Sequence, residues 1–327
     1  MFKKLSSLIF IILLSNVSVS LAGPLGTIPT IQEQNLELVF DLRSDLWTSP
    51  YTYKESPLRI TGGSFRIPLL NTESWAASAL IYTEALNLGR ADFQLGDKSV
   101  FIGNSLRNEL VGFGIRKSWS GGSSLSAFAA FATASDDPWG SPRDDYFYAS
   151  VLYRSEIIDN HNWIFGVDQS GNRGFYNGRP FPYLGVSWFA NERLTVAFGF
   201  PFLHLAWDSG DPEDPWGNDF RLTPYGYTFR SSKDIGDNMI LGFYSAFTVR
   251  SYLYDAREVA EDRLYYQEIL GEVYLSREVT EATSVTFAVG GSVDRKLYET
   301  ERMYHPDSKM QTIENDYYGR ISVEFKL

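Results

Sequence analysis

Arg320-Ile321-Ser322-Val323-Glu324-Phe325-Lys326-Leu327 is the stretch that decides the fold. Its apolar residues alternate one by one with charged or hydroxyl residues. Successive side chains of a β-strand point to opposite faces, so this stretch predicts a strand with one apolar and one polar face. The same alternation recurs upstream, for example over 147–154 and 284–290. We therefore expect an all-β chain.

The alternation predicts about fourteen antiparallel strands, each near or above the ~9–11 residues that a tilted strand needs to cross a bilayer. Pro182, Pro201 and Pro224 fall within or at the ends of three of these strands. Because proline cannot donate to a strand ladder, they indicate bulges, strand starts or misplaced strand ends. Twelve or sixteen strands are therefore also compatible with the pattern. The expected spans are 35–48, 57–70, 74–87, 106–119, 122–134, 145–156, 162–170, 180–190, 193–207, 219–232, 238–251, 263–279, 283–297 and 315–327.

The connections between the predicted strands alternate in length. A barrel that crosses a bacterial outer membrane has short periplasmic turns and long extracellular loops. The sequence therefore predicts a single transmembrane antiparallel up-and-down β-barrel over 35–327, with both chain ends on the side of the short turns. The tight connections are 70–74, 120–123, 159–162, 190–193, 234–238 and 280–283, and the long ones are 87–105, 135–145, 170–180, 208–219, 251–262 and 298–314.

The beginning of the chain predicts export. Lys3 and Lys4 precede an apolar run over 5–14, and small residues follow at 20 and 22. This order predicts a cleaved signal peptide over 1–22, followed by a short periplasmic segment over 23–34. The alternative, a single membrane anchor, would need about 20 apolar residues. The sequence contains no cysteine, which excludes disulfides, thiolate metal sites and lipoprotein attachment.

The composition favours a membrane barrel over a soluble β-sandwich, the alternative that also alternates. Aromatic residues make up 16% of the chain, and Tyr and Trp gather at membrane interfaces. A sandwich does not need loops segregated by length. The formal net charge of −11 argues against nucleic-acid binding, which needs basic patches. The tryptophans that fall close to connections are Trp47, Trp75, Trp119, Trp163 and Trp207.

Across its mature length the sequence resembles bacterial outer-membrane β-barrel proteins. The segment Tyr317–Leu327 resembles the terminal strand that the barrel-assembly machinery recognises in that group, although Leu327 stands where Phe or Trp is common. This resemblance implies insertion into the outer membrane of a Gram-negative bacterium, in contact with lipid and lipopolysaccharide. It implies nothing about cargo. A second resemblance, to an uncharacterised family of such barrels without known activity, rests on Arg179-Pro180-Phe181-Pro182-Tyr183-Leu184-Gly185-Val186-Ser187-Trp188 and Asn191-Glu192-Arg193.

Charged residues alternate with the apolar ones and should face the lumen if the apolar ones face lipid. One interpretation is a water-filled passage for small hydrophilic solutes. The other is a lumen filled and closed by arginine–carboxylate pairs. A barrel of about fourteen strands lies between filled small barrels and open porins, so size does not decide. The candidate lumen residues are Glu37, Asp41, Arg43, Arg66, Arg116, Arg154, Asp168, Arg230, Arg250, Glu268, Glu272, Arg320 and Glu324.

Two of the expected long loops share the tetrapeptide Asp-Pro-Trp-Gly, at 137–140 and 214–217, among further carboxylates. Clustered carboxylate oxygens could hold a divalent cation such as Ca²⁺ or Mg²⁺. The alternative is that Asp-Pro starts a turn and the tryptophan packs on its own loop. No other cofactor is expected. The candidate ligands are Asp136, Asp137, Asp144, Asp145, Asp208, Asp211, Glu213, Asp214 and Asp219.

Signs of catalysis are few. The histidines are His161, His204 and His305. A barrel lipase would pair Ser187 with His204 on the lipid-facing wall, and a barrel protease would join His204 to Asp208 at a rim. We therefore expect, in this order, a channel or transporter for small solutes, a non-conducting structural or surface-interaction barrel, and a hydrolase. The sequence does not decide the oligomeric state.

Overall fold

The structure, a computed structural model, describes residues 37–45, 58–88, 92–95, 97–101, 105–255, 257–303 and 310–326. The predicted signal peptide over 1–22 and the predicted N-terminal segment over 23–34 lie outside these residues. No helix in the described ranges is long and apolar enough to span a membrane.

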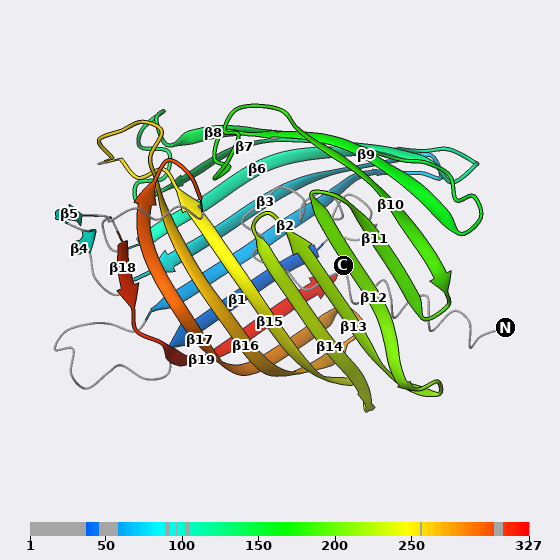
Figure 1. The fold of residues 1–327 in the computed structure, drawn as a ribbon. Coiled ribbons are helices and arrows are strands. Elements are labelled where there is room, and N and C mark those ends of the chain that lie inside the picture. Colours follow the sequence, from blue (N-terminus) through cyan, green and yellow to red (C-terminus); the bar gives the residue numbers. More distant parts are fainter. Residues whose placement is uncertain are drawn as a thin grey trace.

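The described chain is built of antiparallel strands (Figure 1). The first nine are β1 (Glu37–Asp45), β2 (Arg59–Asn71), β3 (Trp75–Asn87), β4 (Asp92–Leu95), β5 (Lys98–Phe101), β6 (Ser105–Ser118), β7 (Ser124–Ser135), β8 (Asp145–Arg154) and β9 (His161–Ser170). The next five are β10 (Phe181–Asn191), β11 (Leu194–Phe200), β12 (Phe202–Asp211), β13 (Asp214–Thr223) and β14 (Gly226–Gly236). The last five are β15 (Met239–Tyr252), β16 (Arg263–Thr280), β17 (Thr283–Thr300), β18 (Met310–Ile313) and β19 (Asp316–Lys326).

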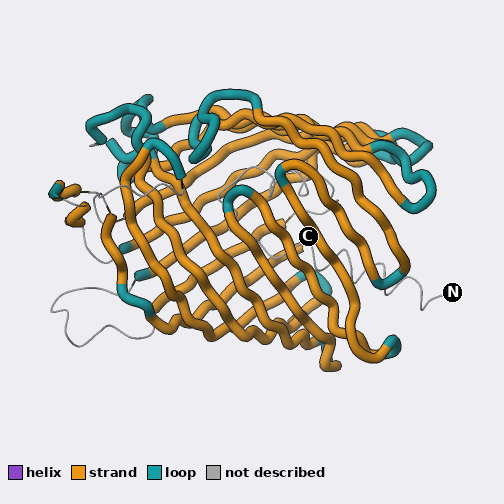
Figure 2. The backbone as a smooth tube through the Cα atoms, in the orientation of Figure 1, coloured by secondary structure: helices purple, strands orange, loops and turns teal. Residues whose placement is uncertain are grey.

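The main sheet closes on itself, because β1 pairs with β2 on one side and with β19 on the other. The sheet has 17 strands, one of which, β18, is a short continuation of the pairing of β17 beyond β19. Sixteen strands therefore form the wall of the barrel (Figure 2). The short strands β4 and β5 pair with each other outside the wall. The predicted all-β barrel is confirmed, with the upper of the strand numbers that the sequence allowed.

The difference between fourteen and sixteen strands comes from two prolines. The expected strand 193–207 is the hairpin β11–β12, which turns at Pro201, and the expected strand 219–232 is the hairpin β13–β14, which turns at Pro224. Proline ends the ladder at both turns because it has no N–H to donate. Gly226 completes the second turn at a φ of +139°, where a Cβ atom would lie 1.9 Å from the carbonyl oxygen of Phe247. Only glycine fits there.

These hairpins change which end of the barrel the second acidic segment occupies. The expected long loop over 208–219 is instead the end of β12, a tight turn at 212–213 and the first half of β13. It lies at the end that also carries the tight turns 72–74, 192–193 and 281–282 and both ends of the described chain, which we call the short-turn rim. The opposite end carries the connections 136–144, 171–180 and 253–262, and we call it the long-loop rim. The prediction that both Asp-Pro-Trp-Gly segments share one side was wrong.

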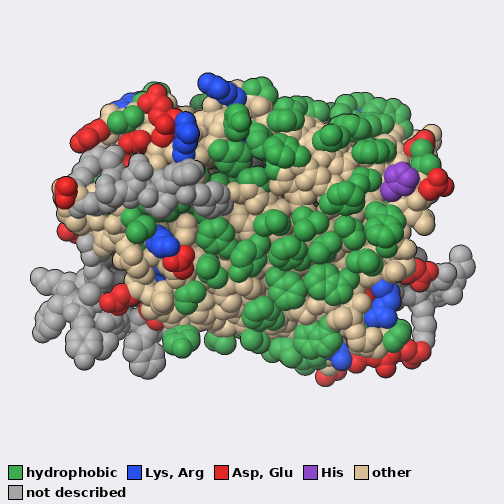
Figure 3. All heavy atoms as spheres, in the orientation of Figure 1, with side chains coloured by type: hydrophobic (Ala, Val, Ile, Leu, Met, Phe, Trp, Pro, Cys, Tyr) green, Lys and Arg blue, Asp and Glu red, His purple; other side chains and the backbone are tan. Residues whose placement is uncertain are grey.

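The outer surface of the wall is apolar. Large apolar side chains cover the visible face of the wall, and charged ones gather toward its two ends (Figure 3). Val151, Val289 and Phe287 are examples of exposed apolar side chains on the strands. Exposed tryptophans, Trp75, Trp119 and Trp163, lie close to the short-turn rim, while Trp47 lies outside the described residues. An apolar band with aromatic residues at its edge is the pattern of a barrel in a bilayer.

The apolar wall leads to a stability prediction. Val289 is 64% exposed in the middle of β17, so Val289→Arg would place a guanidinium in the hydrocarbon layer. We expect a loss of about 2–4 kcal/mol in the free energy of unfolding measured in lipid vesicles. Val289→Leu is the control, because it keeps the site apolar. Equal stability of the two variants in lipid would argue against a membrane-facing wall.

Candidate functional site

The structure places twelve of the thirteen candidate lumen residues on the inner face of the wall. Arg43 pairs with Arg320 across β1 and β19, and Asp168 and Ser150 pair across β9 and β8. Each of these positions has the parity of buried inner residues, opposite to the exposed apolar set. For Glu37 the structure gives only the register position, opposite Arg66 and Lys326. These positions therefore lie on one face of the wall, opposite to the exposed apolar side chains.

A buried charge network crosses the lumen and is centred on Glu268 of β16, which is fully buried. Two nitrogens of Arg43 donate to its two carboxylate oxygens at 2.8 Å each. Arg250 of β15 donates to Glu268 at 3.1 Å and, through Nε, to Glu84 of β3 at 3.1 Å. Ser292 adds a further hydrogen bond to Glu268 at 2.7 Å. Since β3 and β15 are far apart around the ring, this network ties distant parts of the wall together.

A second buried network lies beside the first. Arg320 of β19 donates to both oxygens of Glu272, with Nη2 at 2.5 Å, and reaches Asp41 at 3.4 Å. The hydroxyl of Tyr318 donates to Glu272 at 3.0 Å. The carboxylates of these two networks, Glu84, Glu268, Glu272 and Asp41, are therefore each matched by an arginine, as the interpretation of a closed lumen expects.

The long-loop rim is closed by contacts between opposite walls. The strands β7 and β15 are directly opposite each other in the ring of strands. Nevertheless the N–H of Leu253, just after β15, donates to the carbonyl oxygen of Ala134 near the end of β7 at 2.6 Å. The ends of β15 to β17 at the long-loop rim therefore lie across the opening of the barrel. The buried apolar cluster beneath it joins both walls and includes Leu58, Ile60, Leu86, Leu106, Tyr252, Leu264, Tyr266 and Leu297.

A buried arginine fastens the loops over this rim. Arg257, in the loop 253–262, donates to Asp144 at 2.5 Å and to the carbonyl oxygen of Tyr254 at 2.8 Å. It also donates to the carbonyl oxygen of Arg143. Asp144 is fully buried and accepts a further hydrogen bond from Ser135 at 2.8 Å. We call the pair of Arg257 and Asp144 the rim latch, because it joins loops from opposite walls.

The loop 171–180 covers the part of the wall where β11 to β14 end before their neighbours β10 and β15. The hairpins β11–β12 and β13–β14 stop early, so 181–183 of β10 and 249–252 of β15 extend beyond their pairing with β11 and β14 (Figure 1). Asn172 spans this notch by exchanging two hydrogen bonds with Ser251, at 2.9 and 2.8 Å. Arg173 is buried and binds Asp168, which also accepts from the hydroxyl of Tyr183 at 2.8 Å. Asp168 therefore anchors this loop.

The proposed cation ligands do not come together. The described residues contain no group of three or more acidic or histidine side chains arranged to hold a metal ion. Asp136 accepts hydrogen bonds from Ser135 and from the N–H of Asp255, and Asp144 belongs to the rim latch. Asp137 lies in a turn, and Asp145 begins β8. The tryptophan of the first tetrapeptide, Trp139, stacks on Phe131 with ring centroids 5.8 Å apart, as the turn interpretation expects.

The second acidic group lies at the other end of the barrel. Asp214 forms an ion pair with Lys233 at 2.6 Å, and Asp211 accepts from the N–H of Glu213 at 3.0 Å. Asp208 lies within β12, and Asp219 projects from β13 to the inner face. Within the described part of the chain, the two groups of carboxylates therefore give no shared cation site.

The histidines do not form the hydrolase arrangements that the sequence suggested. His204 lies on the inner face and binds Asp219 at 2.7 Å, while Asp219 also pairs with Arg221 at 2.8 Å. Ser187 is on the same inner face but two strands away, with Ala197 between them. The structure therefore does not bring Ser187 and His204 together on the lipid-facing wall, as the lipase alternative would need. His161 lies at a tight turn, and His305 is outside the described residues.

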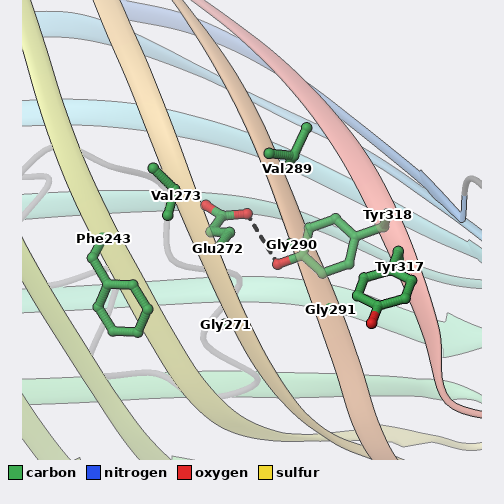
Figure 4. Close-up of a pocket in the computed structure, with 9 residues that line it drawn as sticks. All are labelled: Phe243, Gly271, Glu272, Val273, Val289, Gly290, Gly291, Tyr317 and Tyr318. Atoms are coloured by element: carbon green, nitrogen blue, oxygen red, sulfur yellow. Dashed lines mark hydrogen bonds between the residues drawn. The ribbon is translucent and has the colours of Figure 1, made fainter.

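A shallow hollow of about 460 Å³ marks the outer wall over β15 to β19 (Figure 4). Gly271 and Gly291 form its floor between the side chains of Phe243, Val273 and Tyr317. The missing side chains of the glycines make this space, and its lining is apolar. The hollow is therefore part of the lipid-facing surface. Glu272 and Tyr318 also line it, and the hydroxyl of Tyr318 donates to Glu272 at 3.0 Å.

Several residues of the site could not be found from the sequence. Arg173 and Arg257 lie in loops, where no periodicity indicates which side chain is buried. Tyr266 and Tyr318 have the inner parity of their strands, but aromatic residues occur on both faces of this wall. The sequence signal for Tyr266 and Tyr318 is that tyrosines recur at inner-facing positions of β15 to β19.

Comparisons with known proteins give distant likenesses. No family model and no curated protein matches the chain. Among solved structures, the chain is similar to an outer membrane channel from Pseudomonas putida F1, with 7% identity, 90% and 95% of the two chains covered and a TM-score of 0.36. It is similar to the P. putida toluene transporter TodX at 9% identity, 94% and 93% coverage and a TM-score of 0.38. It is also similar to Pseudomonas aeruginosa OccK9 at 10% identity, 91% and 99% coverage and a TM-score of 0.38. The fold assignment rests on the strand pairing of this chain itself, and the resemblance of 179–193 to an uncharacterised family stays a prediction.

Proposed function

We propose that the protein is a channel of the bacterial outer membrane for small hydrophilic solutes, closed at its long-loop rim in the conformation described. The observation that carries the proposal is the division of the wall into an apolar outer face and an inner face rich in arginine and carboxylate. An inner face of this kind suits water and polar solutes. The solved structures similar to this chain include an outer membrane channel and a toluene transporter, which accords with transport without indicating the solute.

Charged side chains on the inner face that are partly exposed to solvent also support a passage. The inner charges centred on Glu268 and Glu272 are buried and paired, whereas toward β6 to β8 and β12 to β14 Arg116, Arg154 and Arg221 are partly exposed on the inner face. Partly exposed charges favour water in that half of the lumen. We infer that solutes pass along this half and that the rim latch and the loop 171–180 control access from the long-loop side.

A non-conducting barrel is the second candidate, and a specific observation favours it. The Glu268 network and the apolar cluster under the long-loop rim fill part of the lumen, as in a barrel whose interior is structural. Acidic loops would then be the functional surface, toward partners outside the cell.

Purified protein in a planar bilayer separates the two candidates. We expect stepwise conductance with infrequent openings, because the long-loop rim is held by buried hydrogen bonds. Heat-denatured protein from the same preparation is the control for contaminating porins. Complete absence of steps at every voltage, with a folded barrel verified by its altered migration before boiling, would favour the structural barrel.

A further inference from the structure

Two inner arginines lack the partners that the other lumen arginines have. Arg43, Arg250 and Arg320 each pair with carboxylates, whereas Arg116 and Arg154 form no ion pair in the described part of the chain. The Nε atom of each is buried without a hydrogen-bond partner among those residues. The register places the two positive charges on either side of β7, at positions two residues apart along that strand. Placing like charges together without a counter-charge costs stability, which argues for a role other than folding.

The strand register brings hydroxyl groups between these arginines. Arg116 of β6 is opposite Ser126 of β7, and Arg154 of β8 is opposite Ser124 of the same β7. Directly opposite residues have Cβ atoms about 4.5–5.5 Å apart, so the four side chains form one continuous surface. We call this surface the arginine–serine patch; its members are Arg116, Ser124, Ser126 and Arg154.

The patch lies where a solute would meet it. Arg116 is two residues from the end of β6, and Arg154 is the last residue of β8, so both are close to the short-turn rim. Both side chains are partly exposed on the inner face. The patch is rich in donors, because guanidinium groups only donate and serine hydroxyls can donate as well as accept. The guanidinium fork matches the geometry of an oxyanion better than an ammonium group does.

We propose that the arginine–serine patch binds small oxyanions, with inorganic phosphate as the simplest example, at the short-turn end of the lumen. The proposal rests on the proposed channel function, for which it supplies the solute class, but the binding itself does not require conduction. The patch is then the site at which an anionic solute is held before it moves along the partly exposed half of the lumen. Arg221 and Arg230 of β12 to β14 add positive charge to that half, beside the carboxylates of Asp208 and Asp219.

Equilibrium dialysis of the folded protein in detergent with radiolabelled inorganic phosphate tests the site, at constant ionic strength set by chloride. We expect saturable binding that weakens about tenfold or more in Arg116→Gln and in Arg154→Gln, because each removes charged hydrogen bonds. The double variant should lose binding. The matched control is Lys117→Gln, which removes the same charge from the same strand on the outer face, where Lys117 lies 4.9 Å from the ring of Trp75. This control should bind phosphate like the unmodified protein.

The outcomes separate the site from the channel. Absence of saturable phosphate binding, or binding by the double variant equal to that of the unmodified protein, overturns the patch, even if the barrel conducts. Phosphate binding that depends on both arginines supports the patch, even in a barrel without conductance steps. Arg116→Lys, which keeps the charge but loses the fork, should bind phosphate with intermediate affinity. Folding of the double variant is checked by its gel migration before and after boiling, and removal of two repelling charges should leave that migration unchanged.

Discussion

Glu268→Ala is expected to lower the free energy of unfolding by about 3–5 kcal/mol, because it leaves two buried arginines without their shared carboxylate. Arg43 and Glu268 are 4% and 0% exposed, so water cannot replace the lost partner. Arg250 would keep Glu84 but lose its hydrogen bond of 3.1 Å to Glu268. Denaturant unfolding in lipid vesicles, followed by tryptophan fluorescence, measures the change.

The control for this prediction is Glu324→Ala. Glu324 is also on the inner face and pairs with Lys326 at 3.0 Å, but both side chains of this pair are partly exposed to solvent. Exposed pairs contribute about 0–1 kcal/mol, so the control should be almost neutral. The double variant Arg43→Ala with Glu268→Ala should lose less than the sum of the single losses, because the two residues share one interaction. Equal effects of Glu268→Ala and Glu324→Ala would contradict a network that holds the barrel together.

The sequence predicted the faces of the wall better than it predicted the partners across the lumen. A strand repeats every two residues, so the face of Arg250 could be predicted from its own strand alone, whereas its partner Glu84 was not among the predicted lumen residues. Their contact joins residues 166 positions apart. This contact depends on the number of strands, on the register around the whole barrel and on the bend of β15 across the long-loop rim. None of these is present in a local pattern.

The strand number failed at particular residues for a physical reason. The segments 193–207 and 219–232 each have the length of one long strand, and their alternation continues on both sides of the proline. Pro201 and Pro224 interrupt these segments, but a proline within an alternating run is compatible with a bulge as well as with a turn. Both chain ends still lie at one rim, because each of two expected strands is instead a hairpin, and the two strands gained in this way keep the number even. They also place the acidic segment 208–219 at the short-turn rim, which the loop lengths alone could not reveal.

Arg257→Ala is expected to release the long-loop rim. The substitution removes the guanidinium that holds Asp144 and two backbone carbonyl groups, and it leaves a fully buried carboxylate with Ser135 as its remaining side-chain partner. Removing one member of a buried pair costs about 3–5 kcal/mol. If this cost falls on the closed rim and not on the whole barrel, the open population rises roughly a hundredfold or more, since each 1.4 kcal/mol is a factor of ten.

Hydrogen exchange at the N–H of Leu253 measures this release directly. That amide donates to Ala134 on the opposite wall, so its protection reports the closed rim. We expect its exchange to accelerate about a hundredfold in Arg257→Ala, while exchange in the middle of β16 stays slow. Arg179→Ala, in an exposed position of the loop 171–180, removes the same side chain without touching the rim latch and should leave the exchange of Leu253 unchanged.

The same variant connects the rim to transport. If the long-loop rim is the closed end of a channel, Arg257→Ala should raise the fraction of time that the protein conducts in a planar bilayer, and Arg179→Ala should not. Faster exchange at Leu253 with no gain in conductance would mean that the rim opens onto a lumen that the Glu268 network still obstructs. Glu268→Gln combined with Arg257→Ala would then be the decisive variant, because it weakens both barriers while keeping the volume of the side chain at position 268. Unchanged exchange at Leu253 would show that the apolar cluster under the rim, and not the latch, keeps the two walls together.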